Sequence, residues 1–529
     1  MLTVHQRCAC ASVAALTLFG AGLPPAAAAG GDPDLSRFYH QRITWSACEG
    51  EGMPEDMRCG KVTVPLDYER PADGTMDVAL ARFRATGGSR GSVFLNFGGP
   101  GGSGIDQLAL GGKDFMGLTD GYDVVTFDPR GVGRSSPVSC GETPGQAPDT
   151  SATGPGDDDP RAVLGALKKT AADCAKHSGP VLEHIGTVNA ARDMDVMRQA
   201  LGDKKLNYLG FSYGTRLGAV YAAQFPRKVG RMALDGVDTL TEPLSEQGLV
   251  AAEGQQTALE SFLGWCTENI ACPFGQDART ARARVVQLAD SLERDPVPTD
   301  FGGQFTDQDL AGAIGQALYS RQMWPVLEQA LGSLIQDGDT RGLEQLSYGT
   351  AFPATRRPLG PGTGGTGGTD GGLVDAEDVP MDNLPAALMA INCADDPDRL
   401  TETGATDEIG RLRAAYEEAS PVFGEYRLTQ VLMCYGRPAG TDYIREKVHD
   451  VDTAKMLLVG TRGDPATPYR WTLETADRLG PSAVVLDNRS EGHTGYASSA
   501  CVHKKVDDFL LYGSLPHDGS SCGPEDGDH

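Results

Sequence analysis

The chain has 529 residues and a formal net charge of −26 at pH 7. Such an excess of acidic residues opposes binding to nucleic acids and to anionic membrane surfaces. The length indicates more than one domain, or one large domain with an insertion.

The N-terminal segment is typical of a secretory signal peptide. Arg7 is followed by an apolar run from 11 to 23 and then by four alanines at 26–29. The run is too short to cross a membrane, and small residues after it are typical of a signal-peptide cleavage site. We therefore predict that residues 1–29 are removed and that the mature chain is exported, without a membrane-spanning segment.

Strand-like runs follow the signal segment, at 60–65, 76–83, 92–97 and 122–127. The third leads into Gly-Gly-Pro-Gly-Gly-Ser-Gly at 98–104. Glycines allow main-chain N–H groups to approach a substrate oxygen, so we predict that Gly99 provides one donor of an oxyanion hole. The alternative is a phosphate-binding loop, but the run lacks the Gly-Lys-Ser/Thr ending of such loops.

A nucleophile motif follows the next strand. Gly210-Phe211-Ser212-Tyr213-Gly214 lies between an apolar run at 206–209 and a helix-like segment at 217–224. Because this is the strand–turn–helix context of a nucleophile elbow, we predict that Ser212 is the nucleophile and that the N–H of Tyr213 is the second oxyanion donor. A helix at 189–201 and a strand at 229–234 flank the motif. Strands that alternate with helices predict a doubly wound, mostly parallel sheet.

Helical segments dominate from 238 to about 440, at 249–269, 280–294, 307–319 and 323–336. We predict a helical cap over 238–440, inserted into a sheet domain formed by 30–237 and 441–529. Trp265, Trp324 and Tyr319 are interpreted as side chains of the cap core. A glycine- and threonine-rich run at 360–369 predicts a flexible loop.

Two further strands precede the remaining parts of a catalytic triad. Asp464 follows a strand at 455–460, and His493 follows a strand at 483–486 and is flanked by glycines. A serine needs an adjacent base, and the base needs an oriented carboxylate. We predict that Asp464 orients His493, which serves as general base and acid. Asp487 is the alternative carboxylate, although it would sit on the same strand end as His493.

Ten of the twelve cysteines remain once Cys8 and Cys10 are removed with the signal segment. An even number in an exported protein predicts disulfide bonds. Pairing of neighbours predicts Cys48–Cys59, Cys140–Cys174, Cys266–Cys272, Cys393–Cys434 and Cys501–Cys522. A zinc site is the alternative, but the sequence has no C-x-x-C pair, and we expect no metal.

With these residues in place, the chain resembles the secreted tripeptidyl aminopeptidases of the α/β-hydrolase fold, which are relatives of the prolyl aminopeptidases. The resemblance covers nearly the whole mature chain and rests on the runs at 96–104, 128–135, 210–215, 391–395, 464–468 and 491–496. Prolyl aminopeptidases usually have His where this chain has Phe97, and Trp where it has Tyr213. Both departures favour the tripeptidyl branch. The resemblance implies an α/β-hydrolase core with a large, mainly helical cap, and a serine peptidase without a cofactor.

We therefore expect a secreted, extracellular and monomeric serine exopeptidase that releases short peptides, tripeptides foremost, from the free N-termini of peptides and proteins. Such an enzyme needs a carboxylate for the substrate α-ammonium. Asp395 and Asp396 are the candidates and Glu242 is the alternative, although Asp396 before Pro397 also suits a turn or a helix start. The rival functions are a secreted carboxylesterase or lipase, and a catalytically inactive binding protein of the same fold.

Overall fold

The computed structural model describes residues 33–141, 160–299, 303–347 and 372–523. The predicted signal peptide and the glycine-rich run at 360–369 lie outside these residues. Among the helices that are described, none combines the length and the apolar character needed to cross a membrane.

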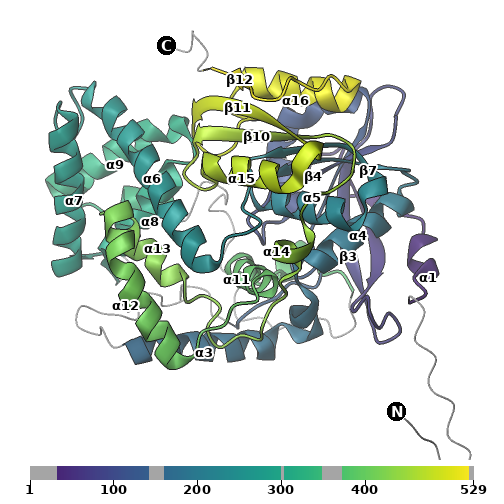
Figure 1. Ribbon diagram of the computed structural model, residues 1–529, viewed down its shortest axis with the longest axis horizontal. Helices are drawn as coiled ribbons and strands as arrows, with labels where there is room; N and C mark the ends of the chain where they lie inside the picture. The colour runs from purple at the N-terminus through teal and green to yellow at the C-terminus, as the bar shows by residue number, and fades with distance from the viewer. Residues whose placement is uncertain (1–32, 142–159, 300–302, 348–371, 524–529) are drawn as a thin grey trace, which may run out of the picture.

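One twisted sheet forms the centre of the molecule (Figure 1). Its order in the described chain is β1-β2-β3-β5-β4-β6-β7-β10-β11-β12. The strands β1, β2, β3 and β5 pair antiparallel, and all pairings from β5 to β12 are parallel. The sheet is therefore mixed: the predicted parallel part runs from β5 to the edge at β12, and the antiparallel strands form the other edge. The strands are β1 (Ser46–Ala47), β2 (Arg58–Pro65), β3 (Thr75–Phe83), β4 (Ser92–Asn96), β5 (Asp123–Phe127), β6 (Leu206–Phe211), β7 (Val229–Asp235), β10 (Met456–Gly463), β11 (Ala483–Glu491) and β12 (Ser520–Cys522), with a separate pair β8 (Val297–Pro298) and β9 (Gln304–Phe305).

Helices cover both faces of this sheet. In β4, Phe94 packs into the cluster that contains α4 and α5, whereas Val93 and Leu95 pack into the cluster that contains α2 and α16. Because both faces are buried, the central strands are continuous apolar runs. The helices around the sheet are α1 (Ser36–Tyr39), α2 (Gly104–Gly111), α4 (Thr187–Ala200), α5 (Tyr213–Gln224), α14 (Tyr443–Lys447), α15 (Tyr469–Leu479) and α16 (Ala500–Tyr512). The helix α3 (Pro160–His177) lies away from the sheet, at the bottom of Figure 1.

A second group of helices lies beside the sheet, on the left in Figure 1. It has its own apolar core, in which Phe262, Trp324 and Phe423 are buried. This helical region follows β7 in the chain, where the sequence predicts the cap. Its helices are α6 (Leu244–Thr267), α7 (Ala278–Arg294), α8 (Asp307–Ala317), α9 (Trp324–Asp337), α10 (Arg341–Ser347), α12 (Glu402–Ala419) and α13 (Gly424–Gln430), while α11 (Asn383–Asp395) runs between them and the sheet.

Two helices connect the helical region with the sheet domain. Leu164 of α3 packs with Ala405 of α12, although α3 precedes the nucleophile in the chain. Ala387 and Ile391 of α11 pack into the core beneath the sheet. The boundaries at 238 and 440 remain predictions, because packing crosses both of them.

All five predicted disulfide bonds are confirmed, namely Cys48–Cys59, Cys140–Cys174, Cys266–Cys272, Cys393–Cys434 and Cys501–Cys522. Cys266 and Cys272 also approach Glu328 at a spacing that could hold a metal ion. Their sulfurs are joined to each other, so they offer no thiolates to a metal.

Candidate active site

Ser212 stands at the turn between β6 and α5, as the motif predicts. Its backbone has φ 55° and ψ −127°, a conformation that non-glycine residues rarely adopt. The N–H of Ser212 donates to the main-chain oxygen of Asp235 at 3.0 Å, and the turn is thereby fixed to the end of β7. This sharp, strained turn is typical of a nucleophile elbow.

Both glycines of the motif are required by close packing. A Cβ at Gly210 would lie 2.5 Å from the main-chain oxygen of Gly214, and a Cβ at Gly214 would lie 2.6 Å from that of Asn96. Neither position has room for a side chain. The spacing of the motif therefore follows from the approach of α5 to the strand ends.

The glycine-rich loop after β4 lies directly against the elbow. A Cβ at Gly98 would lie 3.0 Å from the Cβ of Ser212 and 3.1 Å from the main-chain nitrogen of Tyr213. The N–H of Gly98 donates to Oδ1 of Asn96. Within the described residues, the N–H groups of Gly99 and Tyr213 have no hydrogen-bond acceptor. Two unpaired donors beside a nucleophile are what an oxyanion hole requires.

His493 and Asp464 form a pair at the ends of β11 and β10. Nδ1 of His493 lies 2.9 Å from Oδ1 and 3.0 Å from Oδ2 of Asp464. The carboxylate also accepts hydrogen bonds from Thr467 and from the main-chain N–H groups of Ala466 and Thr494. Since a carboxylate only accepts, the imidazole proton sits on Nδ1, which leaves Nε2 available as a base. Thr467, which the sequence analysis missed, helps to fix the carboxylate.

The charges around His493 favour the protonated form of its imidazole. Burial by itself would lower the pKa of His493, but the adjacent carboxylate of Asp464 outweighs it, and Asp235 and Asp238 add to the effect. The pKa of His493 consequently lies above its ordinary value of 6.5. An imidazolium formed during proton transfer is thus stabilised.

Asp487, the alternative carboxylate, has other partners. Its oxygens accept hydrogen bonds from Arg462 at 2.8 Å and from Arg489 at 3.4 Å. These guanidinium groups hold the pKa of Asp487 below its usual value. The carboxylate that faces His493 is that of Asp464.

The helical region contributes directly to the site through Tyr319, which follows α8. The ring centroids of Tyr319 and His493 are 4.9 Å apart in an edge-to-face arrangement. The main-chain N–H of His493 donates to the main-chain oxygen of Tyr319 at 2.8 Å. Trp324 is buried as expected, but the interpretation of Tyr319 as cap core was wrong, because 36% of its surface is exposed and its ring contacts the imidazole.

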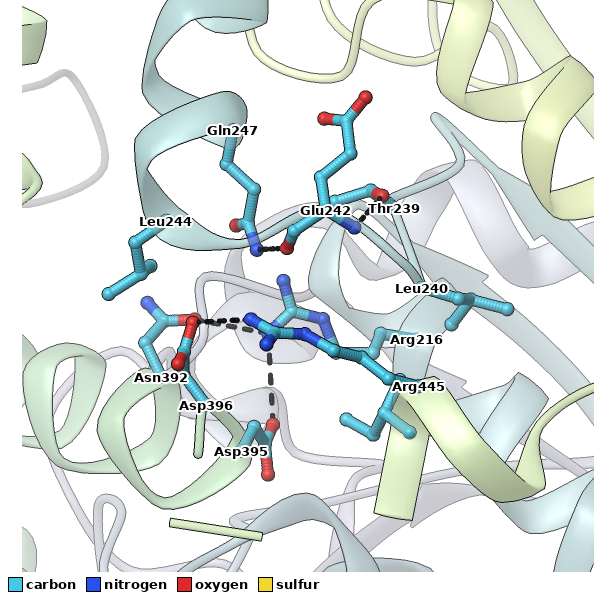
Figure 2. Close-up of a pocket in the computed structure, with 11 residues that line it drawn as sticks. Arg216, Thr239, Leu240, Glu242, Leu244, Gln247, Asn392, Asp395, Asp396 and Arg445 are labelled. Carbon is cyan, nitrogen blue, oxygen red and sulfur yellow. Dashed lines mark hydrogen bonds and ion pairs between the residues drawn. The ribbon is translucent and has the colours of Figure 1, made fainter. Parts of the chain in front are cut away.

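The three candidate anchors for a substrate ammonium line one pocket, together with Arg216 and Arg445 (Figure 2). Arg216 belongs to α5, four residues after the nucleophile. In Figure 2 the carboxylate of Asp395 is turned toward the guanidinium group of Arg216 and that of Asp396 toward Arg445, while the carboxylate of Glu242 points away from them. The structure therefore brings together in space the residues that the sequence separates by about 150 positions.

Each carboxylate in this pocket already has partners. Asp395 accepts hydrogen bonds from the main chain and hydroxyl of Thr187, and its carboxylate lies 3.7 Å from Arg216. Asp396 pairs with Arg445 at 2.9 Å. Glu242 accepts hydrogen bonds from Arg470 at 2.7 Å and from Trp471 at 2.6 Å. Burial raises the pKa of all three carboxyl groups, that of Glu242 to about 7.

The pocket is linked to the predicted oxyanion donor. The hydroxyl of Thr187 donates to Asp395, so the phenol of Tyr213 donates to Thr187 in turn. Arg216 also pairs with Asp238 at 2.9 Å, and Asp238 follows β7 beside the nucleophile turn. A group bound in this pocket would therefore lie within one connected network with the elbow.

Comparisons with known proteins agree with this arrangement. The model of the TAP-like protein family matches residues 420–522, and that of the alpha/beta hydrolase fold matches residues 93–353. Serine protease Hip1 of Mycobacterium tuberculosis is 32% identical, over 91% of each chain. Tripeptidyl aminopeptidase of Streptomyces lividans is 29% identical over 91% of this chain and 87% of its own. Carboxylesterase B of Mycobacterium tuberculosis is 30% identical over 88% of this chain and 86% of its own.

Proposed function

We propose that this chain, which belongs to the TAP-like family of α/β-hydrolases, is a secreted serine exopeptidase. It releases short peptides, tripeptides foremost, from free N-termini. The observation that carries the proposal is the His493–Asp464 hydrogen bond at the ends of β11 and β10, together with the elbow at Ser212, which is fixed to the end of the neighbouring β7 and flanked by the loop of Gly98. Relatives named serine protease and tripeptidyl aminopeptidase support a peptidase.

The proposed reaction uses an acyl-enzyme. Oγ of Ser212 attacks the carbonyl carbon of the scissile peptide bond while Nε2 of His493 takes its proton. Negative charge develops on the carbonyl oxygen, where the N–H groups of Gly99 and Tyr213 donate to it. The C–N bond then breaks, His493 returns the proton to the leaving amine, and the acyl group stays on Ser212. A water molecule then attacks the carbonyl carbon of this ester and gives a proton to Nε2 of His493. The bond between this carbon and Oγ breaks, His493 returns the proton to Ser212, and the peptide leaves with a free carboxyl group.

The first test is Ser212→Ala on a tripeptidyl chromogenic substrate with a free N-terminus. We expect kcat to fall by about 10⁶-fold, the size of loss found when the nucleophile of a serine protease is removed. His493→Ala should lose activity to a similar extent. Turnover close to that of the wild type in either variant would contradict the assignment of the triad.

The alternative to an enzyme is a catalytically inactive binding protein of the same fold. A fluorophosphonate probe distinguishes the two, because it labels a serine only if that serine is activated by a base. We expect labelling of the wild type and none of Ser212→Ala. An unlabelled, correctly folded wild type would favour the binding protein.

We propose that the pocket of Asp395, Asp396 and Glu242 binds the substrate α-ammonium and thereby selects free N-termini. Its lining has three carboxylates and two guanidinium groups. Outside the lining, Arg470 pairs with Glu242 and Asp238 pairs with Arg216, so one negative charge remains when all seven groups are ionised, which for Glu242 requires a pH above about 7. An ammonium would neutralise that charge and would share a carboxylate with an arginine. Asp395 and Asp396 are the preferred partners, since both face the pocket (Figure 2).

The anchor is tested by comparing free and N-acetylated tripeptidyl substrates. Asp395→Asn, Asp396→Asn and Glu242→Gln are measured beside Glu246→Gln, which removes an exposed carboxylate that pairs with Arg470 outside the pocket. We expect that only the variant of the carboxylate that binds the ammonium loses most of the preference for the free N-terminus. The loss should appear as a higher KM for the free substrate. If all three pocket variants keep the preference, the ammonium binds elsewhere.

Secretion is supported by the apolar N-terminal segment and the five disulfide bonds. Expression of the full chain in an exporting bacterial host tests it. We expect the protein in the culture medium with an N-terminus at residue 30. A chain that keeps Met1 and stays inside the cell would contradict secretion.

An esterase is the second candidate, because a relative at 30% identity is named carboxylesterase B. The same triad and oxyanion hole hydrolyse esters and amides. Comparison of tripeptidyl anilides with short acyl esters decides between the two. Activity on the esters alone would reject the peptidase.

A further inference from the structure

Asp235 lies between the nucleophile and the general base and touches the main chain around both. It is the last residue of β7. Its main-chain oxygen accepts the N–H of Ser212 at 3.0 Å. Its carboxylate accepts the N–H of Gly495 at 2.9 Å and that of Tyr496 at 2.7 Å, two and three residues after His493.

The surroundings of Asp235 are rigid. The residue is 0% exposed, and β7 is held between β6 and β10 in the middle of the sheet. Gly236 follows at once, and a Cβ there would lie 3.4 Å from Cε1 of His493. The ring of Tyr496 packs on Phe115 with centroids 5.5 Å apart. Packing therefore fixes both the strand that carries Asp235 and the loop that follows His493.

We propose that Asp235 is a positioning residue for the hydrolysis, which holds the loop of His493 against the strand end that holds Ser212. This inference rests on the triad of the proposed function. The triad chemistry needs Nε2 of His493 at hydrogen-bond distance from Oγ of Ser212, and those two residues come from segments about 280 positions apart in the chain. A misplacement of about 1 Å in such a pair can cost about 10²-fold in rate.

A carboxylate is suited to this position because it accepts both N–H groups. The N–H of Gly495 donates to both carboxylate oxygens and that of Tyr496 to Oδ2. In asparagine an NH₂ would replace one oxygen and would face the N–H of Gly495 at 2.9 Å or that of Tyr496 at 2.7 Å, donor against donor. An unpaired buried N–H costs about 1–3 kcal/mol, which the loop would avoid by moving. Substitution by asparagine should therefore shift the loop without removing the side-chain volume.

The charge of Asp235 acts on the base as well. The ionisable groups that face Asp235 are Asp464 and His493, and those that face His493 are Asp464, Asp235 and Asp238, with the ring of Tyr319 against the imidazole. Burial raises the pKa of Asp235 to about 6, so it is ionised at neutral pH and contributes to the raised pKa of His493. Its removal should lower the pKa of His493.

The experiment compares Asp235→Asn with Asp203→Asn. Asp203 also accepts a strand N–H, that of Ser92 at 3.1 Å, but at the opposite end of β4 and β6. For Asp235→Asn we expect kcat to fall about 10- to 100-fold, KM to stay within about twofold, and the acid limb of the pH–rate profile to move to lower pH. Asp203→Asn should keep the wild-type kcat and acid limb.

A role in folding alone would lower the melting temperature of Asp235→Asn and leave the acid limb unchanged, which would overturn the proposal. A wild-type kcat in Asp235→Asn would do the same. Asp235→Glu keeps the charge and displaces the carboxylate by one methylene. It should keep the acid limb of the wild type and lose kcat, and full activity would contradict a positioning role.

One measurement tests the two hydrogen bonds without any variant, and one comparison of variants separates this inference from the proposed function. In the native enzyme, the main-chain amides of residues 495 and 496 should resist hydrogen exchange, and exchange at the rate of an exposed loop would refute the two hydrogen bonds. If Ser212→Ala and His493→Ala are inactive while Asp235→Asn is fully active, this inference fails and the proposed triad stands. Activity in Ser212→Ala would instead reject the proposed function itself.

Discussion

The Cys393–Cys434 bond should stabilise the fold mainly by restricting the unfolded chain, and only to a smaller extent through the packing of its two sulfur atoms. It joins the C-terminal part of α11 to the segment after α13, and its sequence separation is 41 residues. The Cys266–Cys272 bond, with a separation of 6, is its natural control within the helical region. Both pairs are buried, so replacement of each by two alanines removes similar side chains.

Loop length gives the expected difference. In the chain-entropy model, closing loops of 41 and 6 residues disfavours the unfolded state by about 4 and about 2 kcal/mol at 25 °C. The loss of Cys393–Cys434 should thus cost nearly twice as much free energy of unfolding. It should also loosen Asp395 and Asp396, which follow Cys393 by two and three residues.

Urea unfolding of the two double variants, followed by circular dichroism, measures the free energies. The same proteins are assayed on free and N-acetylated tripeptidyl substrates. We expect the Cys393→Ala/Cys434→Ala enzyme to lose preference for the free N-terminus, and the Cys266→Ala/Cys272→Ala enzyme to retain it. An equal or larger loss of stability in the control would refute the reasoning from loop length.

Three further predictions concern the catalytic groups. The kcat/KM should rise with pH through a pKa above 6.5, because His493 must be neutral to act as a base and its pKa is raised; a pH–rate profile with its acid limb at or below 6.5 would contradict this. Gly98→Ala should slow fluorophosphonate labelling by about 100-fold or more, because its Cβ would lie 2.5 Å from the main-chain oxygen of Phe211 and 3.0 Å from the Cβ of Ser212; unchanged labelling would place the loop elsewhere. Tyr319→Ala should reduce kcat by about two- to tenfold and Tyr319→Phe much less, since an edge-to-face ring contact contributes about 0.5–1.5 kcal/mol; equal kinetics in both variants would show that the ring has no role.

The residues of the proposed triad could be picked out from the sequence because they share one structural position. Ser212, Asp464 and His493 each follow an apolar strand, and the carboxyl ends of parallel strands meet at one edge of a sheet. The strong apolar runs made those strands recognisable. The contact between His493 and Asp464 agrees with this order of segments.

Strand direction was harder to predict. The apolar pattern of β2 and β3 does not distinguish parallel from antiparallel pairing. A signal was present in the connection, since residues 66–74 are too few for the crossover that parallel strands need. The antiparallel edge of the sheet could have been inferred from that short connection.

The contribution of the helical region to the site could not be inferred from local patterns. Tyr319 has the apolar surroundings of a core residue in the sequence, and its contact with His493 depends on how the whole insertion folds back. The helix α12 was missed because it is mostly polar and buries few side chains, among them Leu412 and Tyr416. The helix α11 was missed because Pro385 and small residues obscure its periodicity.

The main-chain hydrogen bond between Tyr319 of the helical region and His493 bears on the stage of folding at which the enzyme becomes active. The N–H of His493 reaches its acceptor only after the segment at Tyr319 has docked. Docking of the helical region therefore helps to place the base. A chain whose helical region is unformed would carry Ser212 without a correctly placed base, and so a peptidase of this design would not act before its fold is complete.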